Sequence, residues 1–305
     1  MEKEKSDIFD RVTRLIVEAI EAGVKTNRLP WHVTGSAHFV PVNAASQKPY
    51  RGVNVIALWA AAEVRGYTSG LWATYPQWQE LGAQVRKGEK SSPVVFWKFP
   101  ERGERPGHNE REEEEQAPDE SAASGRGALA RGYAVFNAAQ VEGFTPPSRF
   151  VLPESKRIEK AEAFFAGVGA NLRAGGDVAC YDPREGAVSM PPFSAFREPV
   201  GYYAVLAHEM THWTGADQRL NRDLSSRFGS EAYAMEELVA ELGAAFLCSL
   251  LGLSTTPRPD HASYLASWLA VLKRDKRAIF TAASHAQKTV DWLAAANIST
   301  ESRAA

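Results

Sequence analysis

The spacing of apolar and polar residues predicts three helices and a strand in the first hundred residues. Residues 6–23 place apolar side chains on one face of a helix, at Ile8, Val12, Leu15, Ile16, Ala19 and Ile20. A second helix is expected at residues 53–65. A third begins at Thr74, because Thr-x-x-Gln forms a capping box with a proline in the first turn, and it ends at Gly82. Residues 93–99 predict a strand.

The pattern then disappears. Residues 101–130 carry no hydrophobic period and are rich in Glu, Gly, Ser and Pro. Such a composition buries too little apolar surface to offset the entropy of ordering, so this segment is expected to be disordered. Residues 132–137 again predict a strand. We therefore interpret residues 101–130 as an acidic excursion between two strands of one sheet, and we place a domain boundary near residues 145–147.

The second half predicts a mostly helical domain over residues 146–305. Helices are expected at residues 155–173, 200–214 and 230–251 and in two further amphipathic stretches to about residue 296, with strands at residues 178–181 and 187–190. Ser155 and Ser230 are the expected caps. The strand at 187–190 is expected to line a substrate cleft. The fold class is α+β: a small mixed α/β domain over residues 1–145, followed by this helical domain.

One short motif in the second half carries metal chemistry. His208 and His212 are four residues apart in an apolar helical run, with Glu209 directly after the first. Positions i and i+4 share a helix face, so both imidazoles face one ion, and Glu209 lies about 100° further round. This H-E-x-x-H arrangement is typical of zinc peptidases, in which the glutamate acts as base. The alternative is a helix with two surface histidines and a stray acid.

A catalytic zinc site needs a third protein ligand, and the next helix offers one. The metzincin pattern fails, because Gln218 stands where a His or Asp is required. We assign Glu237 as the third ligand, in a gluzincin-type arrangement. Glu241, one turn further on, is expected to support a liganding histidine. Glu236 points about 100° away from both and is interpreted as a solvated acid.

These assignments predict metal-assisted hydrolysis. The expected ligands of one Zn²⁺, with other divalent metals as alternatives, are His208, His212 and Glu237. Glu209 takes a proton from water and returns it to the leaving amine. A further donor to the oxyanion is expected, and the candidates are Tyr233, His261 and His285, which the sequence alone does not separate.

The charge is distributed unevenly along the chain. The formal net charge is only −2, yet residues 25–98 carry nine basic residues against three acidic ones, and residues 101–120 carry three arginines against nine acids.

The two cysteines, Cys180 and Cys248, are too few for a disulfide framework and are each interpreted as a small buried hydrophobe. A signal-peptide core and an apolar run near the ~20 residues of a membrane span are both absent, which predicts a cytoplasmic protein.

Aromatic and basic residues alternate in the first domain. Five of the eight tryptophans lie in the first hundred residues, interleaved with tyrosines, arginines and lysines. Aromatic faces that stack on bases within a positive groove are typical of sequence-tolerant single-strand binding. Residues 85–90 hold three basic residues around Gly88, which indicates a phosphate-contacting turn. The alternative is that the tryptophans form the core of a small domain.

The order of these motifs resembles a known family. Residues 29–31, 41–43, 50–54, 58–59, 72–74, 77–78 and 81–90 resemble the N-terminal domain of ArdC-type antirestriction proteins. Residues 208–215, 219–222 and 233–241 resemble the zincin-like peptidase domain that such proteins carry. The resemblance implies a protein of conjugative plasmids that binds single-stranded DNA and protects incoming DNA from host restriction. It extends to the corresponding region of plasmid primases.

Pattern and resemblance together give a set of expected DNA contacts. These residues are Trp31, Tyr50, Arg51, Asn54, Trp72, Trp78, Arg86, Lys87 and Lys90.

Three hypotheses follow for the function. The first is a zinc peptidase that DNA binding brings to a host restriction or DNA-processing protein. The second is a single-stranded-DNA-coating protein whose metal site is structural or inactive and which cleaves nothing. The third is a DNA mimic that acts through the acidic residues 110–120.

Overall fold

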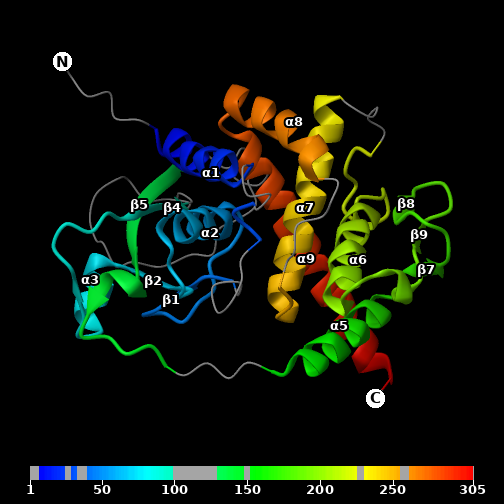
Figure 1. The fold of residues 1–305 in the computed structure, drawn as a ribbon, viewed down its shortest axis with the longest axis horizontal. Coiled ribbons are helices and arrows are strands. Elements are labelled where there is room, and N and C mark those ends of the chain that lie inside the picture. The colour runs from blue at the N-terminus through cyan, green and yellow to red at the C-terminus, as the bar shows by residue number, and fades with distance from the viewer. Residues whose placement is uncertain are drawn as a thin grey trace, which may run out of the picture.

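The chain combines a small sheet region with a larger helical region, the α+β class expected from the sequence (Figure 1). The computed structural model describes residues 7–24, 29–32, 40–98, 129–147, 152–224, 230–254 and 261–304. Within these residues, no helix has the length and apolar character needed to cross a membrane.

The N-terminal half is built on a four-stranded sheet in the order β1-β2-β5-β4. Its strands are β1 (Val42–Asn43), β2 (Leu71–Thr74), β4 (Ser92–Lys98) and β5 (Leu129–Asn137). β1 and β2 are parallel, and the other neighbours are antiparallel. A separate antiparallel pair joins β3 (Gln84–Val85) to β6 (Val141–Glu142).

β4 and β5 are the two strands predicted on either side of the acidic tract. They pair from Ser92 opposite Val135 to Lys98 opposite Leu129. Their predicted pairing in one sheet is confirmed, although β5 begins at Leu129, slightly before the predicted end of the tract. Disorder is predicted for residues 101–130; of these, residues 101–128 lie outside the described residues, and residues 129 and 130 belong to β5.

The three helices predicted in this half are confirmed as α1 (Ile8–Val24), α2 (Val53–Arg65) and α3 (Tyr75–Glu80). Thr74 caps α3 as expected: its hydroxyl accepts the Gln77 N–H, and the Gln77 side chain accepts the Thr74 N–H. α2 is buried along most of its length, because it packs on α1, β4 and α9. It ends at Gly66, whose φ of 69° is the left-handed conformation that glycine adopts without a steric penalty.

The C-terminal half combines long helices with a small sheet that lies beside α6 (Figure 1). Its elements are α5 (Glu154–Val168), β7 (Asn171–Ala174), β8 (Cys180–Asp182), β9 (Ala187–Met190), α6 (Pro199–Thr214), α7 (Glu231–Leu251), α8 (His261–Arg274) and α9 (Ala278–Ala304). The sheet order is β7-β9-β8. Ser230 caps α7 as expected, accepting the Tyr233 N–H. Cys248 is buried as expected, but Cys180 is exposed at the edge strand β8, so that prediction was wrong.

The helix predicted at residues 155–173 is shorter than expected. α5 starts after Pro153, so Ser155 lies inside the helix and is not its cap. It ends at Gly169, which takes the left-handed conformation with a φ of 73°. Residues 171–174 then form β7, which pairs in parallel with β9. The prediction failed because this pairing is made with a distant segment and overrides the local helical pattern.

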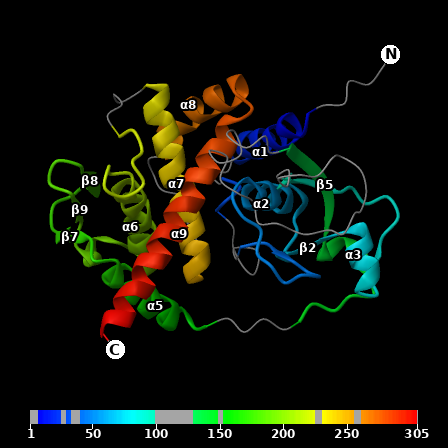
Figure 2. The same cartoon turned by 180° about the vertical axis from the view of Figure 1, so that it is seen from behind.

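The two halves share one hydrophobic core. Trp59 of α2 packs against Phe246 of α7, with ring centroids 5.8 Å apart, and Phe9 of α1 packs against Phe280 of α9 at 4.8 Å. Figures 1 and 2 show α7, α8 and α9 lying between the N-terminal sheet and α6. The boundary near residues 145–147 stays a prediction, and the apolar side chains on either side of it pack together in one core.

α6 and α7 approach each other closely at Gly243. A Cβ at this position would lie 2.5 Å from the hydroxyl and 2.6 Å from the methyl of the fully buried Thr211. We expect Gly243→Ala to destabilise the protein by about 1–3 kcal/mol in urea denaturation, because overpacking outweighs the better helix propensity of alanine. Gly201→Ala on α6 is the control, since the nearest atom to its Cβ would be 3.9 Å away. Equal stability of the two variants would contradict this account of the helix contact.

Candidate metal centre

α6 brings the two histidines of the H-E-x-x-H motif together. The Nε2 atoms of His208 and His212 lie 3.2 Å apart, and the two rings are close to perpendicular at 79°. His208, Glu209 and most of their neighbours on α6 are buried. The two imidazoles therefore converge on one point, as their spacing predicts, and they are not surface side chains.

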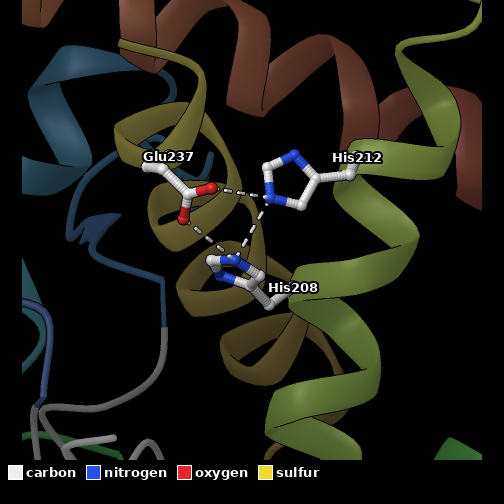
Figure 3. A group of neighbouring side chains, drawn as sticks. All are labelled: His208, His212 and Glu237. Atoms are coloured by element: carbon white, nitrogen blue, oxygen red, sulfur yellow. Dashed lines mark hydrogen bonds and ion pairs between the residues drawn. The ribbon is translucent and has the colours of Figure 1, made fainter. Parts of the chain in front are cut away.

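Glu237 reaches the same point from α7. One of its carboxylate oxygens lies 3.6 Å from His208 Nε2, and the other lies 3.6 Å from His212 Nε2. Figure 3 shows the three side chains turned toward one another between the two helices. One donor atom from each residue lies within 4.8 Å of the other two.

This donor set fits a divalent cation. Two ligands at the Zn–N distance of about 2.0–2.1 Å and at a tetrahedral angle stand about 3.3 Å apart. The 3.2 Å between the two Nε2 atoms is close to that value. Two imidazoles and one carboxylate also form a ligand set of catalytic zinc sites, which keep one position open. The role of the three residues as metal ligands stays a prediction that the geometry supports.

Glu236 is not the solvated acid that the sequence suggested. Its carboxylate contacts His212 Nδ1 at 3.1 Å and pairs with both Nε and Nη2 of Arg222 at 3.0 Å. Burial raises the pKa of Glu236, but the hydrogen bond with His212 and the contact with Arg222 outweigh it and hold the pKa below its usual range. Glu236 is therefore a carboxylate that orients His212 from behind, the role usual for an acid next to a liganding histidine.

Arg222 anchors this carboxylate in the interior. Its guanidinium also donates to the backbone carbonyl of Thr211 and to the hydroxyls of Thr214 and Thr289. A buried guanidinium is tolerated only when its donors are satisfied, as they are here. Sequence analysis missed this residue as part of the centre, because Arg222 follows α6 and meets Glu236 only through the tertiary fold.

The surroundings shift the pKa values of His212 and Glu237 in the directions that favour their charged forms. Burial lowers the pKa of His212, but the hydrogen bond with Glu236 and the charges of Glu236, Glu237 and Glu209 outweigh burial and raise it. Burial raises the pKa of Glu237, but the hydrogen bond with His208, the charges of His212 and His208 and a hydrogen bond from Tyr233 lower it overall. A cation at this point would take the place of the imidazole proton and satisfy the same carboxylates.

Glu209 is held by the small sheet. The backbone N–H of Tyr181, in the edge strand β8, donates to Glu209 Oε2 at 3.0 Å. The sequence predicts that the strand at residues 187–190 lines the cleft, but this segment is β9, the central strand of its sheet. The strand that reaches the H-E-x-x-H helix at Glu209 is β8. A central strand has both edges paired and leaves no backbone groups for a substrate, which is the physical reason for the correction.

Tyr233 lies on α7 one turn before Glu237. Its hydroxyl is 3.4 Å from the hydroxyl of Tyr264 on α8. Burial, followed by the hydrogen bond with Tyr264, raises the pKa of Tyr233, so the phenol stays neutral and keeps a proton to donate. Its role as oxyanion donor stays a prediction. Of the two alternatives, the side chain of His261 lies outside the described residues.

Five of the nine residues expected to contact DNA are buried. They are Trp31, Tyr50, Asn54, Trp72 and Trp78, each at most 5% exposed. Asn54 pairs through its amide with both backbone groups of Val95, and the indole of Trp78 donates to the carbonyl of Phe136. These side chains have no face available for a base, so their predicted DNA contact is corrected to a role in the core. Composition could not separate the two roles, because aromatic residues serve both.

The four charged candidates lie at or near the surface. Arg51 pairs with Asp291 of α9, and Arg86 pairs with Glu89 at 2.7 Å and donates to the Ala139 carbonyl at 2.6 Å. Lys87 and Lys90 are exposed on the turn between β3 and β4. Gly88 shapes this turn with a φ of 90°. The exposed turn is the part of the predicted DNA contact that the structure leaves accessible.

Comparison with known proteins assigns each half of the chain to a family. Residues 6–136 match the family model for the N-terminal domain of the anti-restriction factor ArdC, and residues 159–285 match a zincin-like metallopeptidase family. An uncharacterized protein y4eC of Sinorhizobium fredii is 54% identical, over 94% of this chain and 92% of its own length. A DNA primase TraC of Escherichia coli is 35% identical over 97% of this chain, which spans only 28% of that primase.

Solved structures agree with the sequence comparisons. The metal-free crystal structure of the antirestriction ArdC protein from the R388 plasmid is 38% identical to this chain, with a TM-score of 0.74 over 96% of this chain and 98% of that one. Its Mn(II)-bound structure gives a TM-score of 0.72 over 95% and 98%. The two family matches and the similarity of this fold to that of ArdC from R388 lead to the same assignment. The chain therefore belongs to the ArdC family of antirestriction proteins, with a zincin-like metallopeptidase domain in its second half.

Proposed function

We propose that this protein protects incoming conjugative-plasmid DNA from host restriction by binding single-stranded DNA, and that it carries a divalent-metal peptidase centre. The observation that carries the enzymatic part is the convergence of His208, His212 and Glu237, with Glu209 beside them. The DNA-binding part is supported by membership of the ArdC family and by the exposed basic turn at residues 86–90.

One divalent ion per chain would be held by His208, His212 and Glu237 and would supply Lewis-acid activation of water and of a peptide carbonyl. Zn²⁺ suits this nitrogen-and-carboxylate set, and the Mn(II)-bound ArdC of R388 supports a divalent ion more generally. Glu209 would act as general base and then as acid, accepting a proton from water and passing it to the leaving amine. The Tyr181 N–H fixes one oxygen of Glu209 and thereby orients the carboxylate.

Tyr233 would stabilise negative charge on the substrate. Its neutral phenol lies on the same helix as Glu237 and is tied to α8 through Tyr264. A donor that is already oriented stabilises a developing oxyanion without a cost of reorganisation. The protein substrate would be a host restriction or DNA-processing protein located near the bound strand.

The DNA-binding part is tested at Lys87 and Lys90. Reversing both charges to Glu should weaken binding of a labelled oligonucleotide and reduce the slope of log affinity against log salt by about 1.4, since each lost phosphate contact contributes about 0.7 on single strands. Fluorescence anisotropy at several salt concentrations measures both quantities. Arg86 stays unchanged in this variant, because its bonds to Glu89 and to the Ala139 carbonyl support the turn itself.

A matched control carries the same change in net charge on another surface. Lys156→Glu with Lys160→Glu alters two exposed lysines on α5, in the peptidase half. This control should keep the salt slope of the unmodified protein. Restriction protection should fall with DNA affinity in the turn variant, and protection that survives the loss of DNA binding would refute the proposed mechanism.

A further inference from the structure

A buried chain of contacts links the N-terminal half to the metal centre. The indole N–H of Trp31 donates to Glu241 Oε1 at 3.0 Å, and His32 Nε2 lies 3.3 Å from the same oxygen. The other oxygen of Glu241 lies 3.8 Å from His208 Nδ1. We infer that Trp31 and His32 are positioning residues of the metal centre, acting through Glu241 on His208; this inference rests on the proposed metal site.

The hydrogen bonds of His32 determine its tautomer. Its Nδ1 accepts the backbone N–H of Leu29 at 3.0 Å, so Nδ1 carries no proton. The imidazole is then neutral with its proton on Nε2, which makes His32 a donor to Glu241. Glu241 Oε1 therefore receives two donors from one short segment, residues 29–32.

Two donors on one oxygen determine where the second oxygen points. All four side chains are buried, and a buried carboxylate is costly unless hydrogen bonds or an opposite charge compensate it. Trp31 and His32 satisfy Oε1, which leaves Oε2 facing His208 Nδ1. A carboxylate on that side favours the tautomer with the proton on Nδ1, so that Nε2 presents its lone pair to the ion.

The same segment also supports the other side of the centre. The ring of Trp31 packs on Trp268 of α8, with centroids 6.5 Å apart, and Trp268 stacks on Tyr264 at 6.0 Å. Tyr264 in turn meets the hydroxyl of Tyr233, one turn before Glu237. Trp31 is thus linked to His208 through Glu241. It is also linked, through Trp268 and Tyr264, to the side chain one turn before Glu237.

This arrangement makes the metal centre a joint product of two sequence regions. Residues 29–32 belong to the region matched by the ArdC N-terminal family, and Glu241 belongs to the region matched by the metallopeptidase family. The metallopeptidase region contains the three proposed ligands but does not contain the donors that orient Glu241. Metal affinity should therefore depend on residues outside that region.

The test measures Mn²⁺ affinity of the full-length protein by isothermal titration calorimetry. Trp31→Phe keeps a flat apolar ring and removes the N–H, and we expect it to weaken Mn²⁺ binding by about tenfold, at the low end of the effect of partners behind metal ligands. Trp78→Phe is the control, since it removes an equally buried indole donor whose partner is the Phe136 carbonyl. It should change the affinity by less than about twofold, whatever it does to the melting temperature.

A double-mutant cycle tests the route through Glu241. We expect Glu241→Gln to weaken Mn²⁺ binding by about 10–100-fold, and adding Trp31→Phe to it should change the affinity by less than about twofold more. Unchanged affinity in Trp31→Phe, or full additivity of the two substitutions, would overturn the inference. Absence of peptidase activity in the unmodified protein, together with these affinity changes in the variants, would instead count against the proposed enzyme function and leave the inference standing.

Discussion

Glu209→Gln should reduce peptide hydrolysis by at least about 100-fold while leaving the fold and the metal affinity unchanged. A general base contributes about 10²–10⁴-fold to the rate, and a glutamine of the same shape neither accepts nor returns the proton. The glutamine can still accept the Tyr181 N–H through its carbonyl oxygen, so the contact with β8 is kept. Cleavage of an unfolded protein such as casein, with Mn²⁺ or Zn²⁺ and single-stranded DNA present, gives the measurement on gels.

The control is Glu185→Gln, which neutralises an exposed carboxylate on the turn between β8 and β9. Full hydrolysis in Glu209→Gln would rule out the assigned base. The same variant separates the first two of the three functional hypotheses, since restriction protection is scored independently of cleavage. Loss of protection favours a peptidase that acts on a host protein, whereas full protection favours a DNA-coating protein that needs no proteolysis.

Arg222→Met should destabilise the protein by about 3–5 kcal/mol. Removing one partner of a buried ion pair leaves the other charge uncompensated, and here the remaining group is Glu236. The carbonyl of Thr211 and the hydroxyls of Thr214 and Thr289 also lose a donor. Urea denaturation of the metal-free protein measures the loss as a fall in the midpoint at constant slope.

Two further variants test this explanation. Arg173→Met makes the same substitution at an exposed arginine of β7 and should stay within about 0.5 kcal/mol of the unmodified protein. Adding Glu236→Gln to Arg222→Met should recover part of the lost stability, because the second substitution removes the unpaired charge. A loss below about 1 kcal/mol in Arg222→Met would show that the buried pair contributes little.

The parts of the molecule that the sequence predicted well are those determined by local spacing. The i and i+4 positions of His208 and His212 place two imidazoles on one helix face in any helix. The choice of Glu237 over Glu236 needed only the same period on a second helix, and the structure turns Glu237 toward both histidines. Helix caps such as Thr74 are similarly local, since all their partners lie within one turn.

The predictions that failed depend on contacts between distant segments. The sequence predicts Glu236 to be a solvated acid, whereas in the structure Arg222, fourteen residues earlier, donates to its carboxylate. The sequence predicts Trp31 to stack on a base, whereas in the structure its indole N–H donates to Glu241, 210 positions away in the chain. An aromatic residue has the same appearance in a sequence whether it covers a core or a ligand, and only packing against partners decides between the two.

The register of β4 and β5 has a consequence for how this protein can change during evolution. The chain leaves the sheet at Lys98 and returns at Leu129, and these two residues are direct partners in the ladder. Neighbouring strands are about 4.8 Å apart, so a turn of a few residues can join these two ends. The free energy of closing a loop grows only with the logarithm of its length. A change in the length or sequence of residues 99–128 during evolution is therefore expected to leave the pairing of β4 with β5 and the metal centre unchanged. For the same reason, these residues are a suitable place to insert a reporter protein.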